Sequence, residues 1–141
     1  MKKSLWLLHI LSVLSVCHVA PATNISVLNA NPNRCPALAS LMEDLKTVQF
    51  PVDWTVYVTC DAGAWQGVQR KVGGLHTDAA LTVRSSKLTI INGMMYATPF
   101  SFEHYSQKNS QGILRHELGH ITCNTSSEER ADHFADKGVC R

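Results

Sequence analysis

Two histidines and a glutamate that lie close together in the sequence could bind a metal ion and use it. They are His116, Glu117 and His120, within the stretch from 110 to 121. If this stretch is a helix, histidines four residues apart point their rings the same way, as neighbouring tetrahedral positions on Zn²⁺ require. Glu117 lies one step round the helix, where its carboxylate can reach a zinc-activated water but not the metal. The spacing therefore predicts one Zn²⁺ with Glu117 as the general base of a hydrolase.

A third ligand would distinguish this site from a helix that carries two ordinary polar histidines. One class of zinc hydrolases places a glycine three residues and a histidine six residues after the second histidine of the motif. These positions hold Cys123 and Ser126 here, which excludes that class. The third ligand must therefore be sought further along the chain.

The segment from 128 to 137 reads as a helix that ends at Gly138. Ser126 followed by Glu129 predicts a capping box, which would occupy Glu129 and leave Glu128 free. Glu128 lies at the border of the inward face, where a carboxylate needs a partner, and two histidines holding a cation would supply one. We therefore predict Glu128 as the third ligand. The inward face comprises Ala131, Phe134 and Ala135.

Asp132 lies one helical turn after Glu128 and is expected to accept a hydrogen bond from a ligand imidazole, which would select the ring tautomer. Other interpretations remain open at this point. Glu128 could simply be an acidic residue in the first turn of a helix, where the helix dipole favours it. Asp132 or His133 could be the ligand in its place, and Asp132 could instead form a plain salt bridge.

The sequence His-Glu-Leu-Gly-His from His116 to His120, followed by Glu-Glu-Arg-Ala-Asp-His-Phe-Ala from 128 to 135, resembles the gluzincin metallopeptidases. It is most similar to small soluble members with an ExxAD helix downstream of the motif. The resemblance implies an α+β, zincin-like minimal metallopeptidase domain with a small mixed or antiparallel sheet. It also implies that a peptide substrate pairs with an upstream edge strand, here 79–83 or 87–92.

Three functions are compatible with these residues. The first is a secreted zinc-dependent peptidase, in which Glu117 takes a proton from water. The second is a catalytically weak or inactive zinc-binding interaction or inhibitor domain on the same scaffold. The third is hydrolysis of a non-peptide amide, for instance in a cell wall. A hydrolase would also need a donor to the oxyanion, for which the candidates are His76, Tyr96, His104 and Tyr105.

The N-terminus has the pattern of a secretory signal peptide. Two lysines precede an apolar run over 5–16, and Ala20-Pro21-Ala22 fits a cleavage site, so we expect a signal peptide at 1–22 and one domain at 23–141. A signal anchor is one alternative. A lipoprotein is another, because the residues before Cys17 resemble a lipobox. We expect the mature chain to be secreted, or extracellular or periplasmic, with no membrane attachment.

Removal of the signal peptide takes away two lysines and lowers the formal charge from +2 to zero. A neutral surface gives no reason to expect nucleic acid or an anionic membrane as partner. Four cysteines remain, which in an exported domain indicates two disulfides rather than metal ligands. A helix followed by a returning strand would bring Cys60 back near Cys35, which leaves Cys123 to pair with Cys140.

The remaining elements follow from periodicity and turn residues. We expect an extended arm or loop at 23–33, a helix at 36–49, a strand at 53–60, a helix at 61–72 capped by Asp61, a hairpin of 79–83 with 87–92, and an irregular segment at 94–107. The first helix should bury Leu38, Leu41, Met42, Leu45 and Val48, with Glu43, Asp44 and Lys46 in water, and the second should bury Trp65, Val68 and Val72.

Overall fold

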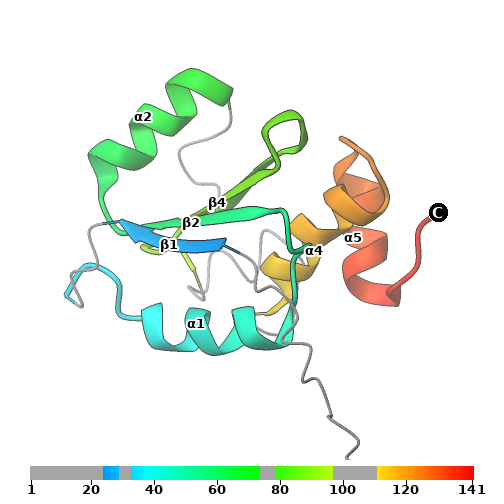
Figure 1. Ribbon diagram of the computed structural model, residues 1–141, viewed down its shortest axis with the longest axis horizontal. Helices are drawn as coiled ribbons and strands as arrows, with labels where there is room; N and C mark the ends of the chain where they lie inside the picture. The colour runs from blue at the N-terminus through cyan, green and yellow to red at the C-terminus, as the bar shows by residue number, and fades with distance from the viewer. Residues whose placement is uncertain (1–23, 29–32, 74–78, 97–110) are drawn as a thin grey trace, which may run out of the picture.

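The computed structural model describes residues 24–28, 33–73, 79–96 and 111–141. These residues form a small mixed sheet of four strands with four α-helices, so the predicted mixed α+β class is confirmed (Figure 1). The predicted signal peptide at 1–22 lies outside the described residues. Within the described ranges, no helix is both long enough and apolar enough to cross a bilayer.

The sheet has the strand order β1-β2-β4-β3. β1, β2 and β4 run parallel, and β3 pairs with β4 in the antiparallel sense. The sheet is thus mixed, with β3 as one edge, and the predicted hairpin is confirmed. A short 3-10 turn at Arg84–Ser86 joins its two strands. The strand bounds are Asn24–Leu28 (β1), Thr55–Thr59 (β2), Ala80–Val83 (β3) and Leu88–Asn92 (β4).

β1 corrects one prediction, because 23–33 was expected to be an arm or loop. Asn24 to Leu28 instead pairs in parallel with the whole of β2. An edge strand buries little, and Asn24 and Ile25 are exposed. Its backbone hydrogen bonds are formed with β2, more than 25 residues away, so no local sequence pattern predicts this strand.

Helix α1, Leu38–Thr47, packs its apolar stripe into the core. Leu41 and Leu45 are buried as predicted. Asp44, which was expected in water, is buried instead and accepts a hydrogen bond of 2.8 Å from the Tyr96 hydroxyl. The buried face of α1 is therefore wider than its apolar stripe, because a polar partner from another segment satisfies the carboxylate.

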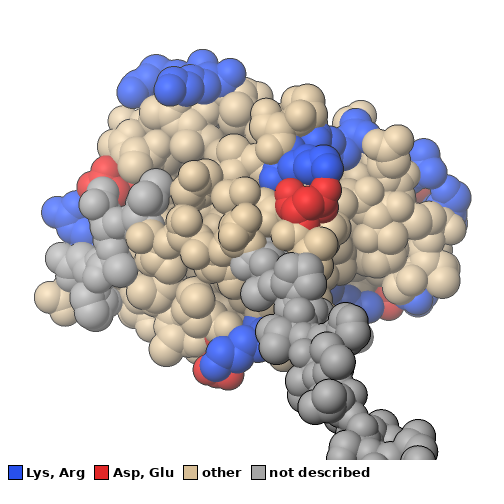
Figure 2. All heavy atoms as spheres, viewed as in Figure 1, with Lys and Arg blue, Asp and Glu red and all other residues tan. Residues whose placement is uncertain are grey.

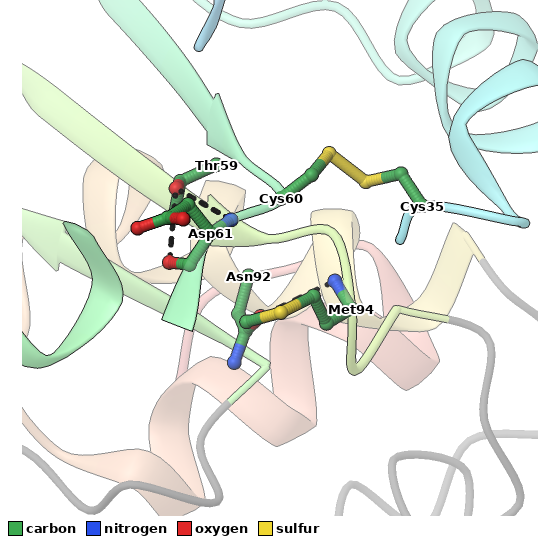
Figure 3. The surroundings of a disulfide bond; sticks show 6 residues. All are labelled: Cys35, Thr59, Cys60, Asp61, Asn92 and Met94. Atoms are coloured by element: carbon green, nitrogen blue, oxygen red, sulfur yellow. Dashed lines mark hydrogen bonds between the residues drawn. A yellow bond between two sulfur atoms is a disulfide. The ribbon is translucent and has the colours of Figure 1, made fainter. Parts of the chain in front are cut away.

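A disulfide between Cys35 and Cys60 connects the segment before α1 to the end of β2 (Figure 3). This pairing was predicted from the helix and strand lengths and is confirmed. Gly93 lies directly against it, since a Cβ at this position would be 2.5 Å from the sulfur of Cys35. Only glycine lets the chain after β4 approach the bridge so closely.

Helix α2, Ala62–Val72, begins where predicted, because the Asp61 carboxylate accepts the backbone N–H of Ala64 at 2.8 Å. Trp65 is buried. Val72, expected to face inward, is exposed in the last turn, which ends at Gly73 with φ +80°. Figure 1 shows α1 and α2 on opposite sides of the sheet.

Helices α4, Gln111–Thr122, and α5, Glu128–Lys137, pack against each other beside the hairpin (Figure 1). α4 also contacts β3 and α1. The predicted end of α5 is confirmed, since Gly138 caps it with φ +74°. The second predicted disulfide, Cys123 with Cys140, joins the end of α4 to the segment after α5.

The face of the molecule in Figure 2 carries small groups of charged side chains, and in several of them basic and acidic side chains lie side by side. No single sign of charge forms a continuous patch among the described residues visible there.

Candidate metal centre

His116, His120 and Glu128 offer three ligand atoms that all lie within 4.8 Å of one another. The two Nε2 atoms are 3.1 Å apart, and Glu128 places its carboxylate oxygens 3.0 Å from Nε2 of His116 and 3.6 Å from Nε2 of His120. Among the residues that the structure describes, this is the only group of three such side chains placed to hold a metal ion. The structure thus brings together the three residues that the sequence predicted as ligands.

Close contact between α4 and α5 brings Glu128 to the histidines. Gly119 of α4 is buried against α5, where a Cβ would be 2.8 Å from the carbonyl oxygen of Ala131. The connecting turn is tight: Asn124 is left-handed with φ +45°, and the N–H of Thr125 donates to the carbonyl of His120. Both features let α5 lie close along α4.

Hydrogen bonds at the far side of each ring select its tautomer. Nδ1 of His116 lies 2.7 Å from the Asp132 carboxylate, and Nδ1 of His120 lies 3.0 Å from the carbonyl oxygen of Thr125. Both partners are acceptors, so each Nδ1 carries the proton. In a neutral ring Nε2 then holds a lone pair, and two such lone pairs converge with the carboxylate of Glu128. A cation is what satisfies three converging acceptors, so these residues fit a divalent ion such as Zn²⁺.

The pKa values of the same groups show that this site favours a positive charge. Burial lowers the pKa of His116, but the hydrogen bond with Glu128 and the charges of Glu117 and Asp132 outweigh it and raise the pKa to about 9. Hydrogen bonds from His116 and His120 in turn hold the pKa of Glu128 well below its usual range. A proton and a metal ion would therefore compete for the same place.

Glu117 lies beside the cluster and is only 2% exposed. Its Oε2 accepts a hydrogen bond of 2.6 Å from the hydroxyl of Thr82 on β3. Burial raises the pKa of its carboxyl, against the opposing charge of His116 and the Thr82 hydrogen bond. Sequence reasoning missed Thr82 and the Thr125 carbonyl, and neither carries a local signal, because Thr82 is an ordinary strand residue and the carbonyl is backbone.

The predicted capping box of Ser126 and Glu129 is wrong. Ser127, not Ser126, caps α5 by accepting the N–H of Arg130, and Glu129 pairs with Arg141 at 3.0 Å. Glu128 nevertheless contacts both histidines, so it is more than an acidic residue in a first turn. His133, the other alternative considered, does not belong to the cluster.

Asp132 contacts the outer nitrogen of His116, as expected of a residue that orients a ligand. Cysteine ligation is excluded, because all four cysteines of the described chain are in disulfides. Of the candidates for oxyanion donor, Tyr96 donates to Asp44 in the core. The other three, His76, His104 and Tyr105, lie outside the described residues.

Comparison with known proteins adds no assignment. No family model matches the chain, and neither the curated proteins nor the solved structures contain a significant match to it.

Proposed function

We propose that this chain is an exported zinc-dependent peptidase of the gluzincin type, built on a minimal zincin-like domain. The observation that carries the proposal is the convergence of His116, His120 and Glu128 beside a fourth side chain, Glu117. A purely structural metal site has no use for a buried carboxylate next to its ligands. A hydrolytic site requires one as general base. The two disulfides are compatible with export.

The chain's own residues take the following roles. His116, His120 and Glu128 hold the ion, and Asp132 and the Thr125 carbonyl keep both rings in the binding tautomer. When bound, Zn²⁺ supplies a Lewis acid that activates water and polarises a carbonyl. Glu117 accepts the proton of the attacking water and passes it to the leaving amine.

The sheet order supports one of the two strands expected to bind substrate. β4 lies between β2 and β3, whereas β3 has a free edge within the described sheet. β3 also contacts α4 and supplies Thr82 to Glu117. An extended peptide added to β3 would therefore run beside the general base.

One observation favours the second function, a zinc-binding domain without turnover. Glu117 is almost fully buried, and one of its oxygens is already engaged by Thr82. A base must reach water, so a site in which Glu117 never becomes accessible would bind the ion and catalyse nothing.

Zinc content and peptide hydrolysis, measured on the same samples of the mature chain, separate these functions. We expect the wild type to bind one zinc ion and to cleave members of a peptide library. Glu117→Gln should retain the zinc and lose about 10²- to 10⁴-fold in turnover, whereas His120→Ala should lose the zinc. Zinc binding without cleavage by the wild type would favour the binding domain. Full activity of zinc-loaded Glu117→Gln would refute Glu117 as the base.

A further inference from the structure

A row of hydrogen bonds leads from Glu117 across the sheet to a buried tryptophan. The Thr82 hydroxyl contacts Oε2 of Glu117 at 2.6 Å, and the hydroxyls of Thr82 and Thr89 are 2.9 Å apart. The indole N–H of Trp54 donates to the Thr89 hydroxyl at 3.0 Å. Thr82 and Thr89 are direct partners across the β3–β4 pair, so one face of the sheet supplies the middle of the row.

The two ends of the row determine its direction. An indole nitrogen can only donate, and the Glu117 carboxylate, in the ionised form in which it could act as a base, can only accept. Each threonine hydroxyl has one proton. Thr89 therefore accepts from Trp54 and donates to Thr82, and Thr82 donates to Glu117. All three hydrogen bonds of the row therefore run in the same direction, from Trp54 toward the Glu117 carboxylate.

Because the row is largely buried, its hydroxyls need hydrogen-bond partners from the protein. Thr89 is completely buried, and Trp54 is 6% exposed. Valine has nearly the shape of threonine and would need no partner, whereas a buried hydroxyl without a hydrogen-bond partner is destabilising. The paired hydroxyls therefore hold the neighbouring side chains to one arrangement.

We propose that Thr82, held in turn by Thr89 and Trp54, is a positioning residue for the Glu117 carboxylate. The hydrogen bond from Thr82 to Oε2 fixes the orientation of the carboxylate, and we assign Oε1 as the atom that takes the proton from water. The catalytic part of this inference rests on the proposed function. The positional part concerns the row of hydrogen bonds and stands on geometry alone.

Thr82 also lies on the edge strand that we propose binds peptide. Its backbone would then help to align the substrate while its side chain aligns Glu117. The same strand, β3, would thus position both the substrate and the base. Misplacement of a base by about 1 Å can cost about 100-fold in rate.

Kinetics of zinc-loaded variants test the catalytic part. Thr82→Val should lower kcat about 10- to 100-fold with KM and zinc content unchanged, and Thr82→Ser should restore most of the loss because it keeps the hydroxyl. Thr59→Val is the matched control, since the hydroxyl of this buried strand threonine has hydrogen bonds only to backbone atoms of Asp61 among the described residues (Figure 3). A Thr82→Val enzyme with wild-type kcat, or a Thr82→Ser enzyme as slow as Thr82→Val, overturns the assignment.

The indole N–H resonances of the ¹⁵N-labelled mature chain test the positional part without any turnover. Trp54 should report the row, whereas Trp65 is an internal reference because its indole N–H has no partner among the described residues. We expect Thr82→Val to shift the Trp54 signal and leave that of Trp65 unchanged, and Thr89→Val to shift it further. An unchanged Trp54 signal in both variants overturns the row itself. A shifted signal in a protein that cleaves no peptide refutes the proposed function but retains the row.

Discussion

The two disulfide-bonded parts of this molecule are held together by different means. The sheet and α1, tied by Cys35–Cys60, share a core of large apolar side chains such as Leu41, Val56 and Ile91. The α4–α5 pair, tied by Cys123–Cys140, meets through Gly119, two alanines and the half-buried Phe134, and the only fully buried residues of α5 are Ala131 and Ala135.

This difference shows where the candidate metal centre draws its stability. Two alanines and one half-buried phenylalanine bury less apolar area than the large side chains of the sheet and α1, so α5 gains less from the hydrophobic effect. Its position depends instead on close backbone approach, on a disulfide and on the polar contacts of Glu128 and Asp132 with the histidines. A bound ion would add directly to that stability. We therefore expect changes to the α4–α5 pair to affect metal binding more than changes of equal size in the sheet.

The largest expected effect comes from filling the contact between the two helices. In Gly119→Val the new side chain would overlap the Ala131 carbonyl, since even a Cβ would lie 2.8 Å from that oxygen. Such overpacking costs about 1–3 kcal/mol. It should also move the carboxylates of Glu128 and Asp132 and lower zinc affinity about 100-fold, as measured by competition with a chromophoric chelator.

Gly67→Val is the matched control for that substitution. Gly67 lies within α2, and a Cβ there would approach nothing closer than the Arg70 guanidinium at 3.9 Å. Both stability and zinc affinity should stay near wild type. If Gly119→Val also kept wild-type zinc affinity, close helix contact would not be what positions Glu128.

Removal of each disulfide in turn compares the two parts of the molecule directly. The bridges span 25 and 17 residues, so loss of either should lower the free energy of unfolding by about 3 kcal/mol on chain-entropy grounds. Only the Cys123→Ser/Cys140→Ser variant should also lose zinc affinity, because its bridge holds the helix that carries Glu128. Urea unfolding and zinc titration of both double variants provide the measurement. Equal losses of zinc affinity would contradict a separate role for the α4–α5 pair.

Asp132→Ala probes the polar contacts alone. Without the carboxylate, Nδ1 of His116 loses its acceptor and the ring is no longer held in the binding tautomer. Zinc affinity should fall about 10- to 100-fold. Asp136→Ala removes the same charge one turn later on α5, where the carboxylate pairs with Lys137, and should leave zinc affinity unchanged. A similar loss in both variants would mean that only the net charge of α5 matters.

The smallest expected effect concerns the first turn of α5. Ser127→Ala removes the side chain that caps the helix and should lower stability by about 1 kcal/mol. Ser126→Ala should have almost no effect. Thermal unfolding of the two variants distinguishes the observed cap from the one that the sequence suggested. A larger loss of stability in Ser126→Ala than in Ser127→Ala would instead support the predicted capping box.

Local patterns predicted much of the fold and the three side chains that converge at the candidate metal centre. Helical periodicity placed His116 and His120 on one face, and the lengths of α1 and β2 paired Cys35 with Cys60, because both depend on neighbours in the chain. Strand β1 and the burial of Asp44 escaped prediction. Each depends on a partner far along the chain, β2 in one case and Tyr96 in the other.

The sequence by itself determined the helix that presents two imidazoles and a carboxylate, because a repeat of 3.6 residues per turn is a local property of the backbone. Only the tertiary structure decided how close α5 comes to Gly119, which ring nitrogens carry protons, and which hydroxyl holds Glu117. Those features depend on side chains and backbone atoms from separate elements, such as Thr82, Thr89 and Trp54, that meet only when the chain is folded.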